Sequence, residues 1–111
     1  MAYNNWASTL LHYAQFIPLE DRHTVFSSAR DKASEAVRLN HQGAEYNLAC
    51  SYARLEDKEN ALYWLEISLN GRVITPQYVL EDEDWTAYRE DPDFQELICS
   101  SQDLILQIVL Y

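Results

Sequence analysis

Hydrophobic residues recur at helical spacing between Gly43 and Asn70, in two stripes separated by a short polar turn. The first stripe follows the i, i+1, i+4, i+7 pattern of one helical face and consists of Leu48, Ala49, Tyr52 and Leu55. The second stripe consists of Ala61, Leu62, Leu65, Ser68 and Leu69. The turn between them is too short for anything but antiparallel neighbours. The pattern therefore predicts a helical hairpin over residues 43–70.

A second pair of helices is predicted over residues 3–40. The first helix covers residues 3–17 and ends before Pro18, because the residue that precedes a proline is pushed out of the helical region. Its apolar side is predicted to consist of Trp6, Leu10, Tyr13, Ala14 and Ile17. The second helix starts between Leu19 and Arg22 and runs to Leu39, with an apolar stripe of Phe26, Ala29, Ala33, Ala36 and Val37.

The chain after Asn70 predicts a short helix and then a longer one. Thr75 and Pro76 have the cap and first-turn chemistry of a helix start, followed by a brief helix that reaches Trp85. Asp91 and Pro92 repeat that chemistry, and apolar residues follow at helical spacing to about Val109. One helix over this stretch is the simplest interpretation, with a break at residues 100–103 as the alternative. The predicted fold class is all-α.

The hairpin over residues 43–70 resembles the tetratricopeptide repeat, a helix-turn-helix unit of about 34 residues. The resemblance is carried by Tyr46, Leu48, Ala49, Tyr52, Ala61, Leu65 and Ser68, in the order aromatic-x-Leu-Ala-x-x-Tyr, polar turn, Ala-x-x-x-Leu, small residue. It implies an α-α superhelix of stacked hairpins and a function in binding other proteins.

The first hairpin resembles the same unit in a stretched form. Tyr13 and Tyr52 occupy matching places and lie 39 residues apart, whereas Ala36 and Ser68 also match but lie 32 apart. About seven extra residues are therefore expected in the first unit, either in the connection between its helices or in its second helix.

Residues 83–98 resemble the degenerate final unit that closes many bacterial chains of such repeats. In that interpretation Trp85 and Phe94 plug the apolar end of the stack, and acidic residues form its outer face. The expected organisation is one domain over residues 1–111, with hairpins at 3–40 and 43–70 and a capping segment at 75–111.

Composition narrows the classes of function. The 111 residues are 48% hydrophobic and contain only two glycines, which suits one helical globule. A formal net charge of −10 argues against nucleic acid and against an anionic membrane surface, and it favours a basic protein partner. The N-terminus has no secretory signal, and the apolar C-terminal stretch is too short to span a bilayer. Two well-separated cysteines, Cys50 and Cys99, are expected to stay reduced in a cytoplasmic protein.

Motifs that would carry catalysis are absent from the sequence. It contains no HExxH, GxSxG, CxxC or glycine-rich phosphate loop, and its three histidines share no common spacing. The prediction is therefore a protein that is not an enzyme and that uses no cofactor and no metal.

Two surfaces are candidates for partner binding. The first is the acidic run Glu81, Asp82, Glu83 and Asp84, which is either a solvated cap face or a platform that steers a basic partner. The second is a concave groove formed by the first helix of each hairpin, with Leu11, Tyr46, Cys50 and Arg54 turned away from the core. The second interpretation predicts that Arg54→Glu weakens partner binding without altering thermal stability.

The C-terminal stretch Leu104–Tyr111 has seven apolar residues out of eight, distributed around every side of a helix. Either it is buried within the monomer or it forms a homodimer interface.

Protein–protein interaction without catalysis is the predicted function, as an adaptor or scaffold that binds a basic partner. The alternative is a cognate immunity protein that neutralises a basic bacterial toxin, which the small size and strong acidity also fit.

Overall fold

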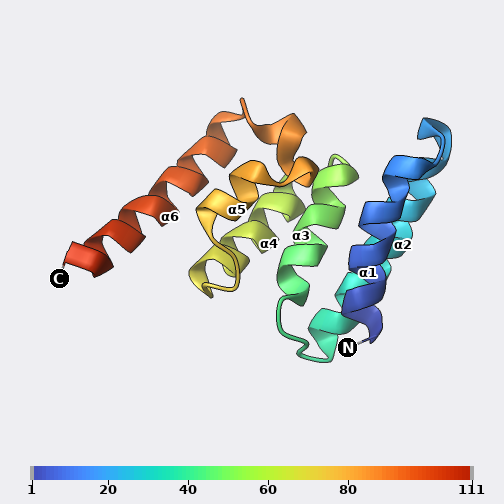
Figure 1. The fold of residues 1–111 in the computed structure, drawn as a ribbon, viewed down its shortest axis with the longest axis horizontal. Helices are drawn as coiled ribbons and strands as arrows, with labels where there is room; N and C mark the ends of the chain where they lie inside the picture. Colours follow the sequence, from blue (N-terminus) through green and yellow to red (C-terminus); the bar gives the residue numbers. More distant parts are fainter. Residues whose placement is uncertain (1, 111) are drawn as a thin grey trace.

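The chain is helical throughout the part that its computed structural model describes, namely the backbone of residues 2–110 and the side chains of residues 3–101 (Figure 1). The elements in chain order are α1 Ala2–Tyr13, the 3₁₀ helix η1 Ala14–Phe16, α2 Leu19–Arg38, α3 Ala44–Arg54, α4 Lys58–Asn70, α5 Pro76–Glu81, the 3₁₀ helix η2 Glu83–Tyr88 and α6 Pro92–Leu110. These residues include no β-strand, so the all-α prediction is confirmed. None of the described helices is long and apolar enough to cross a membrane.

Side chains cap the starts of α4, α5 and α6, and two of these caps, Thr75 and Asp91, are the ones that the sequence predicts. Asp57 caps α4 by accepting the backbone N–H of Asn60, and Thr75 caps α5 by accepting that of Tyr78. At the start of α6, Asp91 accepts the backbone N–H of Phe94 at 3.1 Å and that of Asp93 at 2.9 Å. Gly43 precedes α3 with φ of 84°, a left-handed conformation that suits glycine.

The helices pack as consecutive neighbours in one row, from the α1–α2 pair through α3 and α4 to α5 and α6 (Figure 1). Alanines let the helix backbones approach closely, and six of them on α2, α3 and α4 have no exposed surface: Ala29, Ala33, Ala36, Ala44, Ala49 and Ala61. This packing creates one main core that extends from α1 to α6.

The seven extra residues of the first hairpin lie in its second helix. Leu19 begins α2 six residues after Tyr13, and Lys58 begins α4 six residues after Tyr52, so the connections match in length. Helix α2 has 20 residues whereas α4 has 13, which is the expected difference and corresponds to about two helical turns.

The buried side of α1 is displaced by about one residue from the side that the sequence predicts, so that prediction is wrong. Trp6 and Tyr13 are 49% and 52% exposed, whereas Ala7, Leu11 and Ala14 are buried. Helix α1 packs against both α2 and α3, and Ala7 forms a buried cluster with a residue of each of them. Small side chains suit this close approach, and the large aromatic residues therefore remain on the outside.

The capping segment is broken at Asp82, which separates α5 from η2 with an extended backbone conformation. The prediction of a single helix that reaches Trp85 is therefore wrong. Trp85 and Phe94 are both fully buried, as expected, and their rings stack at a centroid distance of 5.7 Å. Lys58 at the start of α4 forms ion pairs with Asp91 and Asp93, which fixes the start of α6.

Helix α6 runs without a break from Pro92 to Leu110, so the one-helix prediction is confirmed. The expectation of burial or of a homodimer through Leu104–Tyr111 concerns side chains that lie outside the described residues.

Candidate functional site

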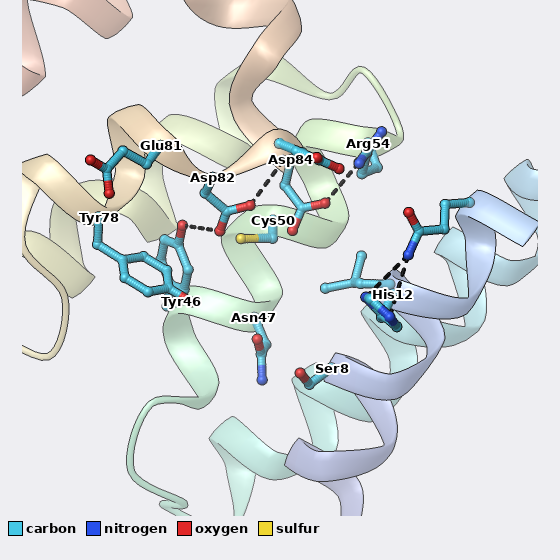
Figure 2. A pocket seen from close by; sticks show the side chains of 13 residues that line it. Ser8, His12, Tyr46, Asn47, Cys50, Arg54, Tyr78, Glu81, Asp82 and Asp84 are labelled. Atoms are coloured by element: carbon cyan, nitrogen blue, oxygen red, sulfur yellow. Dashed lines mark hydrogen bonds and ion pairs between the residues drawn. The ribbon is translucent and has the colours of Figure 1, made fainter.

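A groove of about 540 Å³ lies between α1, α3 and the α5–η2 junction (Figure 2). Its lining includes all eight residues that the sequence proposes for partner binding: Leu11, Tyr46, Cys50, Arg54, Glu81, Asp82, Glu83 and Asp84. We call this hollow the acidic groove. The two surfaces that the sequence treats as separate candidates, the acidic run and the concave side of the hairpins, thus form two walls of one site.

The exposure of these residues differs from the prediction on the α1 and α3 walls. Leu11, Tyr46 and Cys50 are expected to face away from the core, but all three are buried, and the thiol of Cys50 lies at the bottom of the groove. For Tyr46 and Cys50 the reason is the acidic run itself, because it folds back over α3 and covers residues that two hairpins alone would leave open. Leu11 is buried where α1 packs against α2 and α3.

The four side chains of the acidic run differ in exposure, so the run is neither entirely a solvated cap face nor entirely a platform. Glu81 and Glu83 are exposed at the rim, whereas Asp82 and Asp84 turn inwards and are partly buried. This alternation follows from the extended backbone at Asp82, since successive side chains of an extended segment point to opposite sides.

Hydrogen bonds hold the inner wall in place. The phenol of Tyr46 donates to Asp82 Oδ2 at 2.6 Å, and the indole N–H of Trp85 donates to the Tyr46 oxygen at 3.2 Å. Asp82 Oδ1 accepts the backbone N–H of Asp84 at 2.9 Å. Figure 2 shows the resulting chain of contacts from Tyr46 through Asp82 to Asp84. The break between α5 and η2 is therefore fixed by α3.

The guanidinium of Arg54 is held by an ion pair and by a contact with an aromatic ring. Its Nε lies 2.8 Å from Asp84 Oδ1, and its guanidinium lies 5.6 Å from the centre of the Phe26 ring. Burial raises the pKa of the Asp84 carboxyl, and the hydrogen bond from Arg54 opposes that rise. The pair is therefore a structural element at the bottom of the groove.

The wall opposite the acidic run comes from α1. Ser8, His12 and Gln15 lie on the same helical face as Leu11 and line the groove, with His12 next to Gln15 (Figure 2). Ser8 and His12 are not among the residues predicted from the sequence, although their i, i+3, i+4 spacing with Leu11 is the signal that identifies this face. Asn47 Nδ2 donates to Asn4 Oδ1 at 2.6 Å and connects α1 to α3 beside the groove.

No protein-family model matches this chain, and neither does any curated protein or any solved structure.

The groove contains one group with the spacing of metal ligands among the described residues. Cys50, Asp82 and Asp84 place one potential ligand atom each within 4.8 Å of one another. However, both oxygens of Asp82 already accept hydrogen bonds, and Asp84 is paired with Arg54. A cation at this cluster would compete with these hydrogen bonds and would lie beside the Arg54 guanidinium, so we interpret the cluster as a hydrogen-bonded network.

Cys50 is poorly suited to nucleophilic chemistry. Burial, and then the nearby carboxylates of Asp84 and Asp82, raise the pKa of its thiol. Reactive cysteines have the opposite environment, with neighbouring positive charge and a lowered pKa.

Cys50 is expected to react at least about tenfold more slowly than Cys99, since Cys50 is buried and its thiol has a raised pKa. Cys99 is exposed and Cys50 is buried. Ellman's reagent at mildly alkaline pH should modify Cys99 rapidly in the folded protein, and Cys50 only after urea is added. The variants Cys99→Ser and Cys50→Ser assign the two phases. A fast phase that persists in Cys99→Ser contradicts the buried environment of Cys50.

Proposed function

We propose that this chain is a non-catalytic protein–protein interaction module of the tetratricopeptide type. In this proposal it acts in the cytoplasm as an adaptor or scaffold, and the acidic groove holds a basic part of its protein partner. The carrying observation is the charge of the lining, which combines the four carboxylates of residues 81–84 with the single guanidinium of Arg54, a formal net charge of −3. Such a site attracts a cationic partner and excludes anionic ones.

The arrangement of the helices supports a repeat-type module. Two helical hairpins follow each other, and the first helix of each hairpin, α1 and α3, lines the groove together with α5 and its junction to η2. In solenoids of stacked hairpins, the equivalent surface is the extended binding face. Trp85, Tyr88 and Phe94 close the main core at the other end of the row, which is what a terminal unit must do.

The exposed glutamates provide a direct test of the proposed site. Capture experiments with extract from the native source should recover a basic protein, and Glu81→Gln/Glu83→Gln should weaken its binding. A suitable control is Glu59→Gln/Glu66→Gln, which removes the same charge from exposed positions on α4 that do not line the groove. Affinity for the recovered protein should fall as salt rises, and fall less steeply in the groove variant.

Equal binding by the groove variant and the α4 control variant would contradict this proposal. A partner without excess Lys and Arg on its contacting surface would contradict it as well.

A second candidate function is that of an immunity protein for a basic toxin. The observation that favours it is the exposed position of Glu81 and Glu83 at the rim, where carboxylates can occupy the phosphate-binding positions of a nuclease. The two functions differ in a simple assay. An immunity protein abolishes the activity of the captured partner at equimolar ratio, whereas an adaptor leaves that activity in place.

A further inference from the structure

A second groove adjoins the acidic groove. It has a volume of about 440 Å³ and lies between the first half of α2, the end of α3 and η2. Arg54, Glu83 and Asp84 line both hollows, so the two grooves meet at the Arg54–Asp84 ion pair. A segment bound in one groove can therefore continue directly into the other.

The second groove differs from the acidic groove in chemistry. Its lining includes the apolar side chains of Leu19, Phe26 and Ala87, and its ionisable side chains give a formal net charge of only −1 with His23 neutral. Leu19 is 75% exposed at the edge of the groove, whereas Phe26 is only 7% exposed. A large apolar side chain exposed beside a hollow is typical of a binding surface.

The ion pair between the grooves limits what can be recognised there. Asp84 is already neutralised by Arg54, and Arg54 also contacts the Phe26 ring. In the acidic groove, the carboxylates that are exposed to a ligand are those of Glu81 and Glu83. Because Glu83 lines both grooves, a cation held by it lies close to the start of the apolar surface.

We infer that the partner presents one continuous peptide segment with two anchors. A Lys or Arg side chain enters the acidic groove against Glu81 and Glu83, and a large apolar side chain a few residues away covers Leu19 and Ala87 in the second groove. This inference rests on the proposed function of the acidic groove. The two anchors together explain how shallow hollows give useful affinity, since the second contact becomes intramolecular once the first has formed.

The test selects displayed random peptides of about 12 residues, which span roughly 40 Å when extended, on the intact immobilised protein. The recovered peptides should share a basic residue and an apolar residue at a recurrent spacing. One of them is then synthesised, and its Kd is measured by fluorescence anisotropy against variants of each groove. Each variant should raise the Kd by about tenfold, the effect of losing one hot-spot contact.

Matched variants assign the two anchors. Glu81→Gln/Glu83→Gln should affect only peptides that retain the basic residue, and Leu19→Ser should affect only peptides that retain the apolar residue. Ile67→Ser on α4, an exposed apolar position outside both grooves, should have no effect on either peptide.

The possible outcomes distinguish a failure of the two-anchor inference from a failure of the proposed function. Peptides that depend on Glu81 and Glu83 but not on Leu19 would overturn the two-anchor inference and leave the proposed function standing. If no recovered peptide is sensitive to Glu81→Gln/Glu83→Gln, the acidic groove is not the binding site and the proposed function itself fails.

Discussion

Trp85→Ala is expected to lower the free energy of unfolding by about 3–5 kcal/mol, the usual range for truncating a fully buried tryptophan. Trp85 has no exposed surface, stacks on Phe94, and donates its indole N–H to Tyr46. Since a single domain is stable by only about 5–15 kcal/mol, this loss removes a large part of the total. The phenol of Tyr46 would also lose a contact that holds it against Asp82, so the acidic groove should loosen as well.

Two control variants separate packing from hydrogen bonding. Trp85→Phe keeps most of the ring contact but removes the indole donor. The lost hydrogen bond should lower the free energy of unfolding by about 1 kcal/mol, and the smaller ring should lower it further. Trp6→Ala removes a tryptophan that is 49% exposed and whose ring lies 3.9 Å from the Lys32 ammonium, so the cost should be about 1 kcal/mol. Urea denaturation followed by far-UV circular dichroism measures all three. A smaller loss for Trp85→Ala than for Trp6→Ala would show that the cap does not belong to the main core.

The helices and their ends are largely predictable from sequence because local chemistry determines them. Pro18 ends the first helical segment, and Asp57, Thr75 and Asp91 cap helices by accepting backbone N–H groups close to them in the chain. None of these interactions requires knowledge of the tertiary structure. For the same reason, the total length of the first hairpin was predictable, although the position of its extra residues was not.

The helical face of α1 was not predictable in this way. Trp6 and Tyr13 are among the largest apolar side chains of α1 and would bury a large area in a core, but the position of α1 against both α2 and α3 requires small residues such as Ala7. Hydrophobicity alone favours the aromatic face, and only the distance between helices favours the alanine face.

The candidate site was predictable as a set of residues but not as a geometry. Helix periodicity identifies Tyr46, Cys50 and Arg54 as one face, and the charge run identifies residues 81–84. Their meeting depends on the bend at Asp82, which is fixed by a hydrogen bond from a residue 36 positions earlier in the chain. A contact of such sequence separation leaves no local pattern.

The Arg54–Asp84 pair leads to a second large expected effect and revises the prediction made from sequence. Arg54→Glu should destabilise the protein strongly, because it places a third carboxylate beside Asp82 and Asp84 and removes the cation that neutralises them. Arg54→Met is the cleaner variant, since it keeps much of the contact with Phe26 and adds no charge. The side chains of Arg54 and Asp84 are 32% and 16% exposed, so we expect a loss of about 2 kcal/mol, between the values for exposed and fully buried pairs.

The dependence of this loss on pH identifies its cause. Burial raises the pKa of Asp84 in the folded protein, and removal of the Arg54 hydrogen bond should raise it further. A carboxyl whose pKa is higher in the folded state than in the unfolded state destabilises the fold above that folded pKa, and the cost disappears as the pH falls through it. The deficit of Arg54→Met relative to the wild type should therefore shrink as the pH is lowered from neutral towards the ordinary titration range of an Asp carboxyl, about 4.

Asp84→Asn in the Arg54→Met background should restore much of the lost stability and remove this pH dependence, because the buried charge is then absent. Arg38→Met is a control for the loss of an arginine from an ion pair, since Arg38 and Glu35 pair on the surface and their separation should leave stability nearly unchanged. Urea denaturation over the pH series measures the four proteins. If the deficit of Arg54→Met is the same at every pH, Arg54 acts through its packing on Phe26, and the charge of Asp84 does not determine the stability of the groove.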